Sequence, residues 1–115
     1  MPSQVKPIPE GYHTATPYLV VQNAAKALDF YKRAFDAREL HRMETPQGKI
    51  GHAELKVGDS IIMVSDEMPG SDCRSPQSLG GTTANILLYV KDVDAAYEKA
   101  AKDWCEGNGV EYTQD

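Results

Sequence analysis

The residues best suited to chemistry in this sequence are a histidine and a glutamate two positions apart. His52 and Glu54 lie within Lys49–Val57, a segment in which apolar and polar residues alternate. Because successive side chains of a strand point to opposite faces, this spacing puts both groups on one face. The opposite face then holds Ala53, Leu55 and Val57. An imidazole beside a carboxylate can act as a general base pair or, with a third group, bind a metal ion. We therefore predict His52 and Glu54 as candidate catalytic residues, with a solvent-facing polar side of a half-buried hairpin as the alternative.

Other polar residues carry less chemical information. His13 follows the proline-rich start of the chain, and His41 precedes Arg42, so both histidines are expected at the surface. Asp66 and Glu67 form an acidic pair at the end of an apolar segment and are expected to be solvated. We assign no catalytic role to these residues.

Length and composition describe one small globular domain. The chain has 115 residues, 41% of them hydrophobic and 25% charged, with a formal net charge of −5. This balance argues against a disordered chain and against a nucleic-acid-binding protein, which normally has a basic face. No apolar run approaches the roughly 18 residues of a membrane-spanning helix. Met1–Gly11 lacks the pattern of a secretion signal, and Cys73 and Cys105 form no CxxC pair. We expect a cytoplasmic protein with reduced thiols and no nucleic-acid or membrane partner.

The elements that must position His52 and Glu54 follow from periodicity and turn residues. Residues 1–12 contain three prolines and are expected to form an extended tail. Thr14–Val21 is rich in β-forming residues and predicts a strand. Asn23 is the expected N-cap of a helix that runs from Ala24 to near Asp36. Three more strands are expected at Glu39–Glu44, Lys49–Val57 and Ser60–Ser65, and the last two form a hairpin.

The second half of the chain predicts fewer elements. Residues 67–83 are rich in Gly, Pro and Ser and are expected to be a linker. Asn85–Val90 is almost wholly apolar and predicts a buried strand. Asp92 is the expected cap of a second helix, which Gly107-Asn108-Gly109 should end. Val110–Thr113 can form one last short strand.

The chain contains an internal repeat. With an offset of 69 residues, Leu19–Val21 falls on Leu88–Val90 and the cap Asn23 falls on Asp92. The apolar stripe of the first helix continues the match, with Ala27 on Ala96, Leu28 on Tyr97, Tyr31 on Ala100 and Phe35 on Trp104. A strand, a turn and a capped helix therefore recur as a unit.

The repeat predicts an α+β fold of tandem βαβββ modules, of which the second is incomplete. Asp115 corresponds to Pro46, so the second copy has no counterparts of the hairpin strands. We expect a first module at 13–66, the linker at 67–83 and a partial second module at 84–115, together forming one domain. Either the half-repeat is natural, or the chain is truncated at its C-terminus.

Three segments in this order resemble a known family. PYLVVQNAAKALDFYKRAF, GKIGHAELKVGDSIIMVSDE and ILLYVKDVDAAYEKA resemble the vicinal oxygen chelate superfamily, which includes glyoxalase I, the bleomycin resistance proteins and extradiol dioxygenases. Within it they are most similar to the PhnB-like branch, over roughly Tyr12–Ala101. The resemblance implies that two modules pair and that their sheets curl into a half-open cup, which holds the ligand and has helices outside. It also implies a homodimer.

The resemblance also implies which positions line the cup. The superfamily's metalloenzymes take a metal ligand from the first and last strands of each module, and these positions fall on Thr16, Met63 and Asn85. Threonine, methionine and asparagine are poor ligands for zinc, nickel or iron. We therefore predict that the usual metal site and its cofactor are absent, with a divalent metal held by other residues left open. Tyr18 and Tyr89 share the inward parity, and they either stack on a planar ligand or serve as ordinary packing aromatics.

These residues lead to three hypotheses about function. The first is a small-molecule-binding protein of the glyoxalase/bleomycin-resistance type, without the usual metal. Its ligand site would combine the seven candidates Thr16, Tyr18, His52, Glu54, Met63, Asn85 and Tyr89. The second is a divalent-metal-dependent lyase or dioxygenase of the same superfamily, and the third is a truncated, inactive relative. Whether the protein is an enzyme is left open at this point.

Overall fold

The computed structural model describes residues 5–113, which form a four-stranded sheet and three helices. In chain order the first elements are β1 (Tyr18–Val21), α1 (Ala24–Phe35), β2 (Arg38–Glu44), β3 (Ile50–Val57) and β4 (Ser60–Asp66). A short helix α2 (Pro76–Leu79) and a long helix α3 (Val93–Gly107) follow. The predicted α+β class is confirmed, with one complete βαβββ unit followed by only the helix of a second. Within residues 5–113, no helix is long and apolar enough to cross a membrane.

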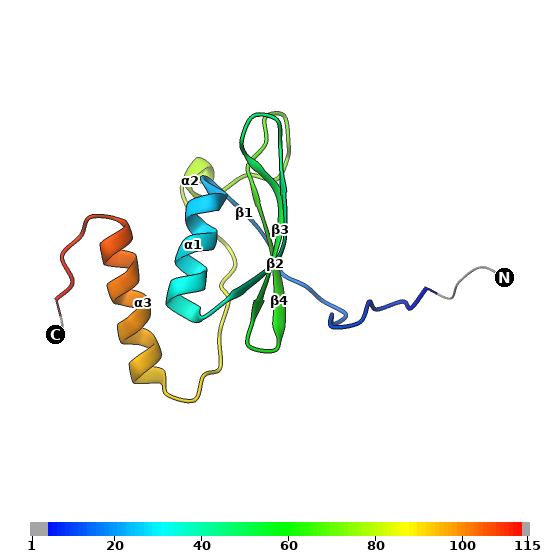
Figure 1. Ribbon diagram of the computed structural model, residues 1–115. Coiled ribbons are helices and arrows are strands. Elements are labelled where there is room, and N and C mark those ends of the chain that lie inside the picture. Colours follow the sequence, from blue (N-terminus) through cyan, green and yellow to red (C-terminus); the bar gives the residue numbers. More distant parts are fainter. Residues whose placement is uncertain (1–4, 114–115) are drawn as a thin grey trace.

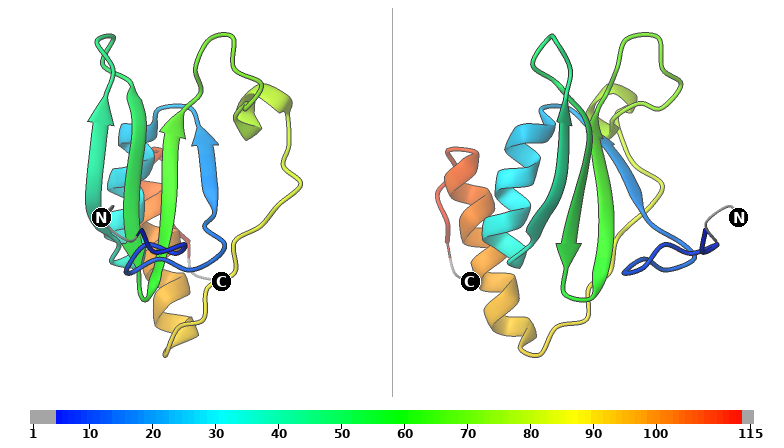
Figure 2. Two further views of the ribbon diagram at one scale, coloured as in Figure 1. Left: turned by 90° about the vertical axis from the view of Figure 1, so that its right-hand side faces the viewer. Right: turned by 45° about the vertical axis from the view of Figure 1, so that its right-hand side comes forward.

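The elements form three layers. Helix α1 covers one face of the sheet, and α3 packs on the side of α1 that points away from the sheet (Figure 1). The strand order is β1-β4-β3-β2, in which β1 pairs in parallel with β4 and the other pairs are antiparallel. No helix of residues 5–113 covers the other face, which only the segment before β1 crosses (Figure 2). We call this side of the sheet the uncovered face.

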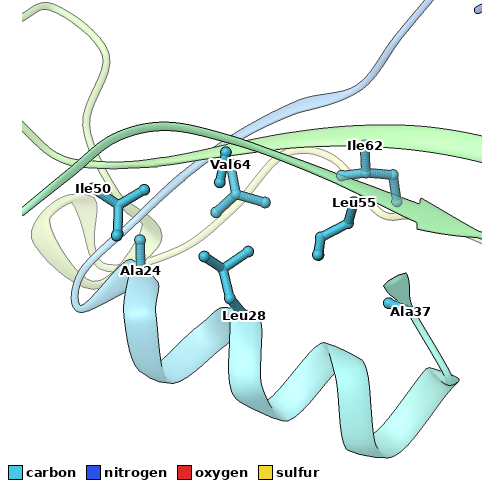
Figure 3. Packing of buried hydrophobic residues seen from close by; sticks show 8 residues of the cluster. Ala24, Leu28, Ala37, Ile50, Leu55, Ile62 and Val64 are labelled. Carbon is cyan, nitrogen blue, oxygen red and sulfur yellow. The ribbon is translucent and has the colours of Figure 1, made fainter. Parts of the chain in front are cut away.

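The hydrophobic core lies between α1 and the sheet. Ala24 and Leu28 point from α1 toward Ile50, Leu55 and Val64 of the sheet (Figure 3). From His52 onward, burial follows the alternation of β3: Ala53 and Leu55 are buried, and His52 and Glu54 face the other way. Ile50 lies on the core side as well, because the pairing of β2 and β3 shifts in register between His52 and Ile50. The alternation therefore leaves the polar residues of β3 on the uncovered face, as predicted.

Both long helices begin with a side-chain cap. The side chain of Asn23 accepts a hydrogen bond from the backbone N–H of Lys26, and that of Asp92 accepts one from Ala95. In both cases the donor lies three residues after the cap, so both predicted caps are confirmed. Helix α3 ends at Gly107, where the glycine-rich stop was predicted. The helical half of the repeat is therefore present in both copies at the same offset.

The strand half of the repeat is present only once. The predicted strand at Asn85–Val90 is wrong, because these residues are exposed and pair with no strand of the described chain. In the first copy, β1 is held by β4, with Tyr18 opposite Met63. Residues 5–113 contain no counterpart of β4 for the second copy. A strand needs a neighbour for its N–H and C=O groups, so this segment stays an extended connection. Val110–Thr113 is not a strand either.

The prediction that the acidic pair Asp66 and Glu67, at the end of β4, is solvated is wrong. Asp66 is buried, and its carboxylate accepts hydrogen bonds from the backbone N–H groups of Ala24, at 2.8 Å, and Ile50, at 2.7 Å. Glu67, the first residue after β4, accepts a hydrogen bond from the N–H of Ser75, at 2.6 Å, and thereby holds the later part of the predicted linker next to the end of the sheet. Ser75 also caps α2. Asp66 is thus a structural link between the start of α1 and the start of β3.

Candidate ligand-binding site

A chain of hydrogen bonds runs across the uncovered face. The hydroxyl oxygen Oη of Tyr18 lies 3.0 Å from Nδ1 of His52. Nε2 of the same imidazole lies 2.9 Å from Oε2 of Glu54. Tyr12 donates its hydroxyl hydrogen to the other carboxylate oxygen, Oε1. The structure therefore brings together three residues that the sequence singled out and adds Tyr12, from the end of the predicted tail.

The strand order explains how these side chains meet. β4 lies between β1 and β3, so Tyr18 and His52 come from strands that are not adjacent. Met63 of β4 is directly opposite both Tyr18 and Glu54, which puts all three on one face. The tyrosine ring is long enough to reach past Met63, and the Tyr18 and His52 ring centroids lie 5.4 Å apart. Met63 is partly buried and provides the apolar surface on β4, between Tyr18 of β1 and Glu54 of β3.

Exposure decreases along the chain of hydrogen bonds. Tyr18 is 48% exposed. The side chain of His52 is 25% exposed, and that of Glu54 is 14% exposed. The phenol is therefore accessible to a ligand, whereas the carboxylate is withdrawn beneath Tyr12 and His52.

The hydrogen bonds determine the protonation of the site. The hydrogen bond from Tyr12, followed by that from His52, holds the pKa of Glu54 below its ordinary value, because both stabilise the carboxylate. The same hydrogen bond to Glu54 raises the pKa of Tyr12 above its ordinary value. An ionised Glu54 only accepts hydrogen bonds, so a neutral His52 carries its hydrogen on Nε2. Nδ1 is then free to accept the hydroxyl hydrogen of Tyr18.

Glu54 should make the stability of the fold depend on pH. A carboxyl with a lowered pKa in the folded state stabilises the fold above its unfolded pKa, here 4.5, and this contribution is lost as pH falls through the folded pKa. We expect the wild-type protein to lose unfolding free energy more steeply than Glu54→Gln below about pH 4.5. Urea denaturation between about pH 3 and pH 7 measures both curves. The exposed Glu111, changed to Gln, serves as the control that follows the wild type, and parallel curves for Glu54→Gln would contradict the assignment.

The other predicted site residues lie in different places. Met63 belongs to the uncovered face, next to the hydrogen-bonded chain. Thr16 lines a smaller cavity of about 170 Å³, together with Ile61 and the connection at 86–88. Asn85 and Tyr89 lie on the exposed connection, where Tyr89 is 96% exposed and lines a wide groove beside α3. Neither meets His52, because the strand that would have aligned them is not formed. Their role in a ligand site stays a prediction.

The positions at which the superfamily's metalloenzymes hold a metal ion carry poor ligands in this chain. Thr16, Met63 and Asn85 offer a hydroxyl, a thioether and an amide, which are weak ligands for a transition metal. Among residues 5–113, no three His, Cys, Asp or Glu side chains are grouped so that they can hold a metal ion. Both carboxylate oxygens of Glu54 are engaged by hydrogen bonds. The side chains present therefore fit hydrogen bonding to a ligand better than metal coordination.

Sequence reasoning missed one member of the hydrogen-bonded chain, Tyr12. This residue follows Gly11 in a proline-rich segment without periodicity, so no pattern indicated which strand it approaches. Its backbone N–H donates to the carbonyl of Pro9, which forms a turn in front of the sheet. The tyrosine at the end of the predicted tail was the only available signal.

Comparison with known sequences identifies a matching family and curated relatives. The model of the Glyoxalase/Bleomycin resistance protein/Dioxygenase superfamily matches residues 12–109. An uncharacterized protein of Mycobacterium bovis is 47% identical over 88 residues, which are 74% of this chain and 58% of that protein. An uncharacterized protein of Mycobacterium tuberculosis has the same identity over 88 residues, which are 74% of this chain and 52% of its own length. The chain thus spans a little more than half the length of these curated relatives.

Solved structures share the fold. A gene product of Arabidopsis thaliana has a TM-score of 0.63 and 28% identity, covering 80% of this chain and 73% of its own. TioX from Micromonospora sp. ML1 has a TM-score of 0.53 and 28% identity, covering 78% and 69%. The fosfomycin resistance protein FosX from Listeria monocytogenes has a TM-score of 0.54 at 15% identity, covering 89% and 75%. At that identity the likeness to FosX shows the fold alone.

Proposed function

The chain belongs to the Glyoxalase/Bleomycin resistance protein/Dioxygenase superfamily, and we propose that it binds a small organic molecule on the uncovered face. The ligand class is a planar molecule with a hydrogen-bonding group. Its ring stacks on Tyr18, and its polar group reaches the Tyr18 hydroxyl or His52. No bound metal is part of this proposal.

The hydrogen-bonded chain from Tyr12 to Tyr18 is the observation that carries the proposal. A sheet face that merely faced water would not need an ionised carboxylate engaged at both oxygens and an imidazole bonded at both nitrogens. Such an arrangement fixes side-chain rotamers in advance, so less entropy is lost when a ligand binds. Met63 adds an apolar surface between the strands. A few fixed polar groups beside apolar area are typical of small-molecule sites.

A titration followed by NMR tests the binding proposal. The probes are a library of planar aromatic fragments and metal-free bleomycin, added to isotope-labelled protein. We expect saturable shifts of the Tyr18 and His52 ring signals, and we expect Tyr18→Ala to weaken binding about tenfold. The matched control is Tyr97→Ala on α3, because Tyr97 is more exposed than Tyr18 and lies outside the site. Binding only at other surfaces, or no shift of these rings with any probe, would overturn the proposal.

A divalent-metal-dependent lyase or dioxygenase is the second candidate function. The observation in its favour is that His52 and Glu54 share a face with His41, whose ring centroid lies 6.3 Å from that of His52. These three side chains are not grouped as metal ligands in the structure, so a metal ion would have to draw them together. Imidazole and carboxylate are suitable ligands for zinc, iron and nickel. Metal content after dialysis against Zn²⁺, Ni²⁺ or Fe²⁺ decides between the candidates. Stoichiometric metal that is lost in both His52→Ala and Glu54→Ala would favour the second one.

We also propose that the chain forms a homodimer. The stripe of α3 that corresponds to the core-facing stripe of α1 is exposed: Tyr97 is 74% exposed, whereas its counterpart Leu28 is completely buried. Val93 and Trp104 extend this exposed stripe. Apolar surface of this kind favours association. A monomer at every concentration in sedimentation velocity would contradict the homodimer.

An inactive relative, the third hypothesis, would neither bind the probes nor hold a metal.

We also propose a branch of the superfamily and a cellular compartment for this protein. The segment from Pro17 to Phe35 supports the PhnB-like branch of the superfamily. Cys73 and Cys105 are free thiols, which supports a reducing compartment such as the cytoplasm.

A further inference from the structure

We propose that Tyr18 is an activated phenol and a catalytic residue, with His52 as the base that takes its proton and Glu54 as the residue that positions His52. The substrate class is a small molecule with an electrophilic acyl carbon that bears a leaving group, such as an activated ester. This inference rests on the proposed function, because the substrate would occupy the same face. It goes further in assigning a reaction to the site.

The order of the groups carries the inference. A hydroxyl becomes a good nucleophile when a base lies within hydrogen-bond reach and a third group orients that base. Here the phenol of Tyr18 is 3.0 Å from Nδ1 of His52. The other nitrogen of the imidazole is 2.9 Å from the carboxylate of Glu54. The three groups are therefore hydrogen-bonded in the order hydroxyl, imidazole, carboxylate.

The exposure of Tyr18, His52 and Glu54 matches their proposed roles as nucleophile, base and positioning residue. The nucleophile must reach the substrate, and Tyr18 is the most exposed of the three side chains. The carboxylate is the least exposed, so its charge acts at short range on an imidazolium that forms when His52 takes the proton. Tyr12, bonded to the second carboxylate oxygen, keeps Glu54 in place.

The reaction step balances within these groups and the substrate. Oη of Tyr18 forms a bond to the acyl carbon, and the bond from that carbon to the leaving oxygen breaks. The phenol proton passes to Nδ1 of His52 and from there to the leaving oxygen. Water then hydrolyses the acyl-tyrosine, releases the carboxylic acid and restores Tyr18.

The other tyrosines provide internal controls. Tyr89 and Tyr97 are more exposed than Tyr18, and no imidazole contact of either is found in residues 5–113. Tyr12 donates to a carboxylate, which raises its pKa and makes it a poorer nucleophile at neutral pH. If exposure alone set reactivity, Tyr89 and Tyr97 would react faster than Tyr18.

The experiment treats the full chain with p-nitrophenyl acetate near pH 7 and maps acetylation by peptide mass spectrometry. We expect Tyr18 to be acetylated at least about tenfold faster than Tyr89 and Tyr97. His52→Gln, which can keep a hydrogen bond but cannot take the proton, should lower the Tyr18 rate about a hundredfold. Glu54→Gln should lower it about tenfold and change its pH profile. The control His13→Gln should keep the wild-type rate, because His13 lies outside the hydrogen-bonded chain.

Two results would overturn the inference. One is a Tyr18 rate no higher than that of Tyr97 in the wild-type protein, and the other is an unchanged Tyr18 rate in His52→Gln. Circular dichroism of each variant establishes that it is folded, and added imidazole should restore the Tyr18 rate in the cavity variant His52→Gly. Failure here leaves the binding proposal intact, because the NMR titration detects ligand without any acyl transfer. If the titration detects no binding but Tyr18 is still acetylated, the proposed ligand class is wrong and the activated phenol is retained.

Discussion

Changing Leu28 to alanine should lower the free energy of unfolding by about 3 to 4 kcal/mol. Leu28 is completely buried at the centre of the interface between α1 and the sheet, where it faces Val64 and Leu55 (Figure 3). Removing three carbon atoms there loses their transfer free energy and leaves a cavity that the sheet cannot close. Because small domains are stable by only about 5 to 15 kcal/mol, the variant should unfold at a much lower urea concentration.

The matched control for this prediction is Leu79→Ala. Leu79 is exposed at the end of α2, so the same change of side chain should alter the unfolding free energy by less than about 0.5 kcal/mol. Equal losses for the two variants would mean that the core does not centre on the contact between α1 and the sheet. Urea denaturation followed by circular dichroism measures both.

Changing Asp66 to alanine should lower the free energy of unfolding by about 3 kcal/mol. The carboxylate accepts hydrogen bonds from Ala24 and Ile50, which are both buried. Hydrogen bonds to a charged group contribute about 1.5 to 3 kcal/mol each, and in the variant both N–H groups lose their acceptor. The N–H of Ala24 belongs to the first turn of α1, which has no acceptor within the helix. The negative charge also interacts favourably with the positive end of the helix.

Two further variants test the Asp66 prediction. Asp66→Asn keeps one oxygen acceptor but turns an amide donor toward the second N–H, so its loss should be similar to that of the alanine variant or slightly smaller. Asp72→Ala, in the exposed loop after β4, should change the unfolding free energy by less than about 0.5 kcal/mol. A loss of under about 1 kcal/mol for Asp66→Ala would refute the structural role, because one hydrogen bond to a charged group already exceeds that figure.

Local patterns predicted most of the first module. The helix caps at Asn23 and Asp92 were confirmed, because a capping side chain bonds to an N–H only three residues away. The alternation of β3 placed His52 and Glu54 on one face, because the two-residue period of a strand is a property of the local backbone. The α+β class follows from these same short-range signals.

The failures have a common cause in contacts between distant residues. The apolar composition of Asn85–Val90 was sufficient to predict a strand, but pairing requires a neighbour that the chain does not place beside it. The burial of Asp66 depends on donors from α1 and β3, and neither is near it in sequence. Tyr12 joined the site through a turn that no pattern indicated.

The sequence by itself determined the helices with their caps, the faces of the strands and the family resemblance, because these depend on residues within a few positions of one another. Only the tertiary structure decided that Tyr18 and Tyr12 meet the His52–Glu54 pair. Strand order and register put β4 between β1 and β3 and bring Tyr18 to His52, 34 residues away in the sequence. The turn before β1 brings Tyr12 to Glu54, 42 residues away. Hydrogen bonding between strands fixes the strand order, and this bonding joins residues that are far apart in the sequence.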